Sequence, residues 1–399
     1  MTLLSPFPLD PPSEKLADLI LQMRHADLLT ACTRLTPFTR AEHPLLSCVR
    51  LDFAPQSLTL SGSNLETTAR IQVPARCSGV AHLRLPLARL LKWLGLPSPC
   101  KVLELNLRGS RLTLCRGDLS AELGVSLEVE DALEPDAPCK SDPGGCPPQI
   151  RLPATALRSL LERTLPAAMT QEPTYSRSAS HPFLGVALEF SGATLCLSAT
   201  DGSRLARCEA ALESPPEGAL EGAPPPQPWS TRLRAADMLA LLKILPKKGD
   251  ELVALEWGLR PGRVQFNLGD HTQLTLCELS PRSWHEAPLM GAPAVETVTL
   301  EAGGLLTALK VLALSKRPKT KKLGLSLEGG ELRVYPESTA TPQRGGSALM
   351  KVSCTDLLKV LASLSGPVTL ERTAVDGRGH GTLRAKDGHG FIGVVSYQH

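Results

Sequence analysis

A strand–turn–strand pattern occurs three times in this chain at a constant spacing of 137 residues. In the middle copy, Val186, Leu188 and Phe190 alternate with residues that are smaller or charged, which is typical of a half-buried strand. The matched apolar positions are Val49, Val186 and Leu323; Phe53, Phe190 and Leu327; and Leu58, Leu195 and Leu332. A repeat of this length indicates several copies of one domain-sized unit.

Three such units account for nearly all of the 399 residues. We predict an N-terminal extension at residues 1–17 and units at residues 18–148, 149–292 and 293–399. Stretches rich in Pro and Gly at 134–148 and 280–293 favour linkers between the units. A similar stretch at 213–228 favours a loop insertion within the second unit.

Each unit is predicted to contain two strand–helix–hairpin modules, which gives an α+β architecture of three repeated domains. Leucines recur at helical spacing in the second module of each unit. The first helices are expected at residues 25–35, 153–165 and 302–316, and the second helices at 85–96, 235–245 and 354–364.

Composition limits the classes of function. Hydrophobic residues make up 42% and charged residues 21% of the chain, as in soluble globular proteins. The net charge of +3 permits contact with nucleic acid without requiring it. The 11 cysteines form no CxxC pair, and Cys139 and Cys146 lack the further ligands of a zinc site. With no convincing signal peptide and no membrane-spanning run, we expect a cytoplasmic protein.

Catalytic motifs are weak. His380 and His389 lie in a Gly-rich stretch, but this stretch does not join a strand to a helix as phosphate-binding loops do, and it fits two β-turns better. Asp201 with Arg204 is the other pair that an enzyme could use. Because no Ser/His/Asp set or carboxylate pair stands out, we expect no enzyme, no metal and no cofactor.

The second strand of the middle copy leads into Ala-Thr-Asp-Gly-Ser-Arg-Leu-Ala at residues 199–206. This segment, with residues 58–75 and the threefold repeat, resembles the bacterial DNA polymerase III β subunit family, the sliding clamps. The resemblance covers nearly the whole chain. It implies three clamp domains, and a head-to-tail homodimer closed into a ring around double-stranded DNA with helices inside and sheets outside. Such a ring tethers the replicative polymerase, and weak phosphate contacts allow it to slide.

The resemblance also implies two sets of site residues. The DNA-binding set is Arg24, Arg40, Phe183 and Lys243; other helix cations that could face DNA include Arg34, Arg89, Lys92, Arg158, Arg163, Lys310 and Lys359. A hydrophobic pocket would take short peptides of the DNA polymerase III α subunit, the clamp loader and repair polymerases. Its predicted residues are Leu184, Thr200, Gly202, Ser203, Arg204, Leu205, Pro288, Ile392 and Val394.

The chain departs from the family pattern in several places. Ser203 stands where the family usually has His, and the chain ends in Ser-Tyr-Gln-His instead of a Met- and Leu-containing tail. The usual Pro-Arg-Lys before the second helix of the middle unit is Arg234-Ala235-Ala236. The alternatives are therefore a specialised clamp paralogue that docks partners outside bulk replication, and an enzyme that uses Asp201 and Arg204.

Overall fold

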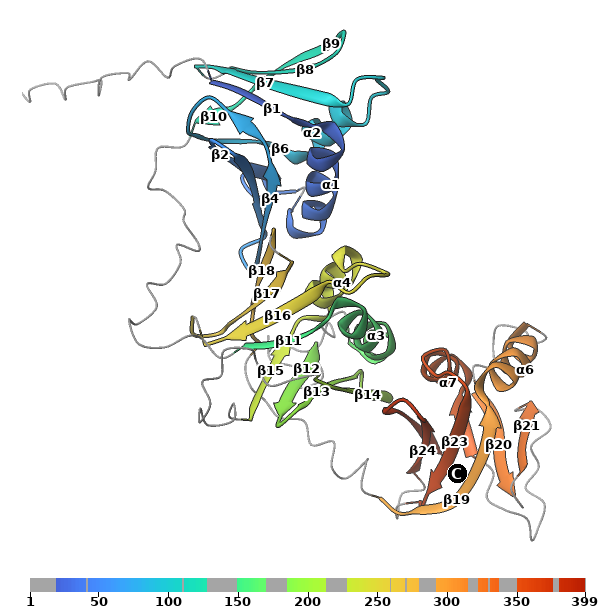
Figure 1. Cartoon of the computed structure of the whole chain (residues 1–399). Helices are drawn as coiled ribbons and strands as arrows, with labels where there is room; N and C mark the ends of the chain where they lie inside the picture. Colours follow the sequence, from blue (N-terminus) through green and yellow to red (C-terminus); the bar gives the residue numbers. More distant parts are fainter. Residues whose placement is uncertain are drawn as a thin grey trace, which may run out of the picture. The chain divides into compact units, whose positions relative to one another are not determined.

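The computed structural model (Figure 1) describes residues 19–40, 42–109, 111–127, 149–169, 185–212, 228–258, 260–269, 271–279, 292–314, 322–328, 331–336, 350–375 and 380–398. The chain forms two compact units, Met1–Gly145 with Gly269–Thr275 and Cys146–Leu268 with Leu276–His399. The first unit holds the first copy of the repeat and Gly269–Thr275 of the second copy, and the second unit holds the rest of the second copy and the third. The predicted extension, Cys139 and Cys146, and all but the last residue of the predicted insertion lie outside the described residues.

The described part of the first repeat contains two α-helices and ten strands. They are β1 (Leu19–Arg24), α1 (His25–Leu35), β2 (Cys48–Ala54), β3 (Ser57–Ser63), β4 (Thr67–Pro74), β5 (Arg76–Cys77), β6 (Ala81–Pro86), α2 (Leu87–Leu94), β7 (Val102–Arg108), β8 (Arg111–Arg116), β9 (Leu119–Gly124) and β10 (Ser126–Leu127). Its strands follow the orders β5-β1-β7-β8-β9 and β10-β6-β2-β3-β4.

The described parts of the second and third repeats each run from a strand and a helix through a hairpin to a second helix, which is followed by three strands. The second comprises β11 (Gln149–Pro153), α3 (Ala154–Thr164), the 3-10 turn η2 (Leu165–Ala167), β12 (Val186–Ser191), β13 (Thr194–Thr200), β14 (Arg204–Ala211), β15 (Trp229–Leu233), α4 (Ala235–Ile244), β16 (Leu252–Trp257), β17 (Arg263–Leu268) and β18 (Thr272–Cys277). The third comprises β19 (Ala294–Glu301), α6 (Ala302–Leu314), β20 (Lys322–Glu328), β21 (Glu331–Pro336), β22 (Met350–Ser353), α7 (Cys354–Leu361), β23 (Pro367–Thr373), β24 (His380–Asp387) and β25 (Phe391–Gln398).

The predicted α+β class and the threefold repeat are confirmed. The helices of the second modules are shorter than predicted. In the first repeat, Leu85 and Pro86 belong to strand β6, where Leu85 pairs with Val49, so the helix begins at Leu87. Proline fixes an extended conformation that suits the residue before the helix, and Pro86 has φ −64° and ψ 118°.

The 137-residue spacing is preserved in the register of the hairpins. Phe190 pairs with Leu195 in the second repeat. The equivalent pairs are Phe53 with Leu58 and Leu327 with Leu332. A shift of one residue would turn every apolar side chain to the opposite face, so the same buried face fixes the same register in each repeat.

Helices cover one face of these strands. The helices of each repeat pack as a pair: α1 with α2, α3 with α4, and α6 with α7. Leu51, Leu188 and Leu325 lie at equivalent positions and are completely buried. Burying a leucine side chain contributes about 1.5–3 kcal/mol. The repeated leucines therefore hold each sheet to its own helix pair.

Gly185, which precedes β12, allows the backbone of strand β15 to approach closely. It has a φ of +88°, and a Cβ atom placed on it would lie 2.2 Å from the backbone oxygen of Leu233. We expect Gly185→Ala to lower the unfolding free energy of the second unit by about 1–2 kcal/mol for the left-handed backbone. Overpacking should cost about 1–3 kcal/mol more. Chemical denaturation measures the total.

Gly192→Ala is the matched control, because Gly192 has a φ of +62° and open space around its Cα. It should show the cost of the left-handed backbone alone. Equal losses of stability in the two variants would contradict the close approach of Leu233 to Gly185.

Candidate functional site

The loop of residues 200–204 joins β13 to β14 and is built by two side chains. Asp201 Oδ1 accepts hydrogen bonds from the backbone amides of Ser203 (3.0 Å) and Arg204 (3.1 Å) and from Ser203 Oγ (2.9 Å). Thr200 Oγ1 donates to the carbonyl oxygen of Arg204 (2.6 Å) and accepts from the amide of Gly202 (3.1 Å). Gly202 adopts a φ of +90°, which side chains disfavour. These bonds all lie within the loop and fix its shape.

Arg204 connects this loop to the third repeat. Its guanidinium group forms ion pairs with Asp201 Oδ2 (2.7 Å) and Asp356 Oδ1 (2.9 Å), and its side chain is only 8% exposed. Asp356 lies in the first turn of α7, where its amide donates to the Oγ of the capping residue Ser353 (3.3 Å). One buried cation thus joins a loop of the second repeat to a helix of the third.

Strands β14 and β25 continue this connection as one antiparallel ladder. Arg204 pairs with Val395, and Leu205 pairs with Val394. The amide of Ser396 also donates to the carbonyl of Ser203 (3.1 Å). The second and third repeats therefore share a continuous sheet.

A second buried cation, Arg163 of α3, lies along the same contact. It pairs with Asp387, whose carboxylate is completely buried, and its Nε donates to the carbonyl of Ser363 (3.0 Å). The guanidinium carbon also lies 4.8 Å from the ring centre of Phe391. Burial raises the pKa of the nearby Cys208 thiol to about 11, so this cysteine is neutral at physiological pH.

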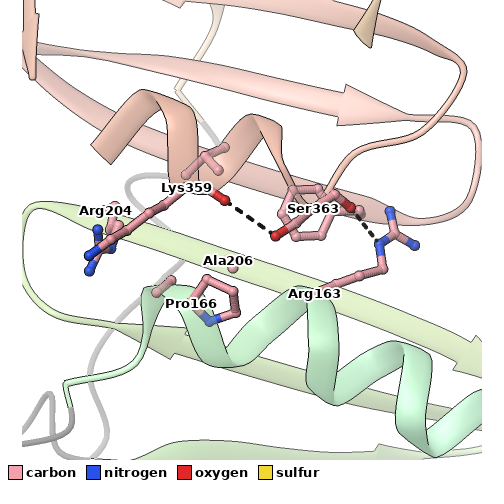
Figure 2. Close-up of a pocket in the computed structure, with 9 residues that line it drawn as sticks. Arg163, Pro166, Arg204, Ala206, Lys359 and Ser363 are labelled. Carbon is pink, nitrogen blue, oxygen red and sulfur yellow. Dashed lines mark hydrogen bonds between the residues drawn. The ribbon is translucent and has the colours of Figure 1, made fainter. Parts of the chain in front are cut away.

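Figure 2 shows the seam between these elements, with Arg163, Pro166, Arg204, Ala206, Lys359 and Ser363 labelled. Lys359 and Ser363 come from α7 and the turn that follows it, facing β14, α3 and η2 of the second repeat. The crevice between them is too narrow to hold a water molecule. It is a packed junction, and a ligand would have to bind outside it.

The residues predicted for the peptide pocket fall into three groups. Gly202 and Ser203 are exposed at the tip of the loop. Thr200, Arg204, Leu205 and Val394 are buried, and Ile392 is half-buried. Leu184 and Pro288 lie outside the described residues. The structure brings the described members together along β13, β14 and β25, and the pocket itself stays a prediction.

The predicted DNA-contacting residues lie on separate elements of the two units. The Arg24 side chain is 76% exposed and pairs with Asp27. The Arg40 side chain is 51% exposed and lies 3.5 Å from Glu66, and Lys243 is exposed on α4. Phe183 lies outside the described residues. These assignments also stay predictions.

Two of the other helix cations have structural partners. Arg158 donates to the carbonyl oxygens of Leu242 (3.0 Å) and Leu245 (2.8 Å) at the end of α4. A cation at a helix C-terminus is stabilised by the helix dipole and by the free carbonyls there. Arg158 and Arg163 side chains are each only 16% exposed, so they are anchored within the protein.

The carboxylate of Asp201 is fully engaged within its loop. Asp201 already accepts three hydrogen bonds and an ion pair, so this carboxylate is poorly placed to act as a base. Within the described ranges, no group of three or more His, Cys, Asp or Glu side chains could hold a metal ion. None of the helices in those ranges is long and apolar enough to span a bilayer.

Sequence reasoning missed Asp356 and Asp387. A serine three residues before Asp356 is a helix-start signal, which the structure bears out at Ser353. That signal does not reveal that the carboxylate also binds an arginine 152 residues away. Asp387 precedes a glycine in a turn, and its partner is 224 residues distant.

Solved structures similar to this chain include proteins described as sliding clamps or DNA polymerase III β subunits. A sliding clamp from Pseudomonas aeruginosa, bound to griselimycin, is 19% identical with a TM-score of 0.77, and the match covers 96% of this chain and 100% of that one. A sliding clamp from Bacillus subtilis is 15% identical with a TM-score of 0.77 and the same coverage. The DNA polymerase III β subunit from Thermotoga maritima is 16% identical with a TM-score of 0.74, covering 96% and 99% of the two chains. No protein-family model matches the sequence.

The similarity extends over almost the full length of each compared chain. This chain therefore has the fold of the β sliding clamps, as the segment at residues 199–206 and the repeat predicted. Its low sequence identity to these structures agrees with a divergent sequence.

The Arg163–Asp387 pair gives a test of the junction. Arg163→Met would leave a buried carboxylate without its cation, which typically costs about 3–5 kcal/mol. We expect this loss in the unfolding free energy of the second unit, measured by chemical denaturation. Adding Asp387→Asn should recover part of it, because the uncompensated charge is then removed.

The same substitution at an exposed helix cation, Lys243→Met, is the control and should change stability by no more than about 0.5 kcal/mol. If Arg163→Met proved as stable as Lys243→Met, the ion pair would not hold the junction.

Proposed function

We propose that this chain is the protomer of a sliding clamp. Two copies would join head to tail around double-stranded DNA, without sequence specificity, and tether the replicative DNA polymerase. The observation that carries the proposal is the threefold repeat in the clamp fold, with one helix pair in every repeat. The clamp itself would be a non-catalytic subunit acting in the cytoplasm.

The charges on the helices support a DNA-facing role. The six described helices carry eight Lys or Arg residues and four Asp or Glu residues. Exposed cations lie on four of the helices. They are Arg89 and Lys92 on α2, Lys243 on α4, Lys310 on α6 and Lys359 on α7. A few exposed cations distributed over several helices favour weak phosphate contacts, which a ring that slides requires.

The edges of two sheets support the dimer. Among the strands that the structure describes, β9 ends the sheet β5-β1-β7-β8-β9, and β21 ends the strand order of the third repeat. In both strands the apolar side chains are only half-buried, including Leu119 and Leu123 in β9 and Leu332 and Val334 in β21. By contrast, Leu112 and Leu114 of the neighbouring β8 are completely buried. Since an open apolar edge favours pairing with another chain, we infer that β9 of one copy pairs with β21 of its partner.

The loop of residues 200–204 is the proposed docking site for partner peptides. Gly202 and Ser203 would contact the peptide directly, while Arg204, Leu205, Ile392 and Val394 support the loop from the β14–β25 ladder. Leu184 and Pro288 would complete an apolar pocket beside it. Partners in this proposal are the polymerase α subunit, the clamp loader and repair polymerases.

A topological link to DNA is the direct test of the clamp. After loading onto nicked circular DNA, the protein should stay with the circle through gel filtration, and cutting the circle should release it. This follows because a ring held by topology slides off free ends. Equal loss from circular and linear DNA would refute the proposal.

Charge reversal tests the helix cations in the same assay. The variant with both Lys92→Glu and Lys243→Glu should load poorly, because each change replaces a phosphate-attracting charge with a repelling one. Lys351→Glu, an exposed cation on strand β22, should load like the wild type.

The edge pairing predicts the oligomeric state. Leu123→Asp would place a carboxylate at the β9 edge and should convert the dimer to a monomer at micromolar concentration. Sedimentation equilibrium measures the mass, and thermal unfolding verifies that each protomer remains folded.

Ile20→Asp provides the comparison, because Ile20 is a 46% exposed apolar residue on β1, which pairs on both sides. This variant should remain a dimer. A dimeric Leu123→Asp variant would exclude β9 from the interface.

A further inference from the structure

The loop of residues 200–204 has a counterpart 137 residues earlier in the chain. In the first repeat, the amide of Asn64 donates to the carbonyl of Thr67 (3.1 Å). In the second repeat, the amide of Asp201 donates to the carbonyl of Arg204 (3.3 Å). In both copies Oδ1 of the first residue also accepts from the amide of the fourth, at 2.7 Å and 3.1 Å respectively. The two loops therefore close with the same hydrogen bonds.

The backbone of the two loops also has the same left-handed position. It is occupied by Leu65 with a φ of +77° in the first repeat and by Gly202 with a φ of +90° in the second. The fourth residue is what separates the copies. Thr67 is completely buried and carries no charge, whereas Arg204 forms ion pairs with two carboxylates. Only the second loop can thus be tied by charge to another repeat.

The charged groups of the second loop act in series. Asp201 holds the amides of Ser203 and Arg204 with its Oδ1, and its Oδ2 is held by the Arg204 guanidinium (2.7 Å). The other end of the same guanidinium is held by Asp356 Oδ1 (2.9 Å). Hydrogen bonds between charged groups are roughly twice as strong as neutral ones. The orientation of the Asp201 carboxylate, and with it the shape of the loop, therefore depends on Asp356.

Asp356 is itself fixed by its helix. It lies in the first turn of α7, where its amide donates to Ser353 Oγ (3.3 Å). The positive end of the helix dipole stabilises a carboxylate at this place. Leu357 and Val360 of the same helix are buried. The carboxylate is thus a fixed point of the third repeat, to which a loop of the second repeat is attached.

The position of Asp356 suits support of the loop better than contact with a partner. Its Oδ2 lies 3.5 Å from Ser203 Oγ, beside the exposed tip that Gly202 and Ser203 form. The Asp356 side chain is nevertheless only 21% exposed, and its other oxygen is taken by Arg204. A bound peptide would meet the tip of the loop and leave this carboxylate behind it.

We propose that Asp356 is a positioning residue of the docking site, which holds the loop of residues 200–204 through Arg204 in the shape that a partner peptide binds. This inference rests on the docking role proposed above. It makes the site a property of two repeats, because the loop comes from the second and its anchor from the third. It also assigns docking to one of the two loops, since Thr67 cannot form this ion pair.

Asp356→Asn tests the positioning in the full-length protein with two measurements. Hydrogen-exchange mass spectrometry needs no partner, and the amides of residues 200–206 should exchange about tenfold faster, as expected for the loss of one charge-assisted hydrogen bond. The dissociation constant for the purified DNA polymerase III α subunit of the same organism should rise by about tenfold for the same reason. Thermal unfolding verifies that the variant is folded.

Asp387→Asn is the matched control, because it makes the same chemical change at the other buried arginine of this contact. That arginine is Arg163, whose hydrogen-bond acceptors among the described residues all lie in the third repeat. The variant should lose at least as much thermal stability as Asp356→Asn. Its loop exchange and its affinity for the α subunit should stay within about twofold of the wild type, as for independent sites.

A double-mutant cycle shows whether Asp356 acts through Arg204. Arg204→Met should weaken binding of the α subunit, and adding Asp356→Asn should cause little further loss. Unchanged loop exchange in Asp356→Asn, an equal loss of affinity in Asp387→Asn, or independent losses in the cycle would each overturn the proposal. A wild-type protein that fails to bind the α subunit would instead count against the docking role itself, and the exchange measurement would still decide whether Asp356 positions the loop.

Discussion

Each repeat of this protein depends on the burial of one face of a sheet beneath a pair of helices. A half-buried sheet tolerates only one strand register, and the pairs Phe53 with Leu58, Phe190 with Leu195 and Leu327 with Leu332 keep that register three times. The other face of the strands is not fixed by burial beneath the helices, so its side chains can vary from repeat to repeat. An Asx turn follows the second strand of the hairpin and is held by Asn64 in the first repeat and by Asp201 in the second. The next residue differs between the copies, being Leu65 in the first and Gly202 in the second.

Periodicity made much of the fold predictable. The helix of residues His25–Leu35 and the strand before it follow from comparing the copies, although the stretch alone reads as one long helix. Alternation also located the hairpins. These signals are local, because they arise from which face of an element meets the core.

The site was less predictable because its partners are distant in sequence. The segment at residues 199–206 identified the loop, but not the carboxylate of α7 that holds Arg204. Arg158 and Arg163 were candidates for DNA contact on charge alone, whereas the structure places them against helix carbonyls and a buried aspartate. The left-handed conformation of Leu65 could not be read from the sequence, since leucine normally avoids it.

The ladder between β14 and β25 has a consequence for synthesis of the chain. Strand β25 begins 180 residues after β14 ends. At ordinary rates of translation, the ribosome needs about 10–40 s to make that stretch. During this interval the edge of β14 has no partner from the third repeat and could pair with a neighbouring nascent chain. Arg204, Arg207 and Glu209 place charges along that edge, and charged residues on an edge strand discourage such mispairing. The charged residues of the strand that joins the two repeats in the finished protein thus also limit mispairing of the incomplete chain.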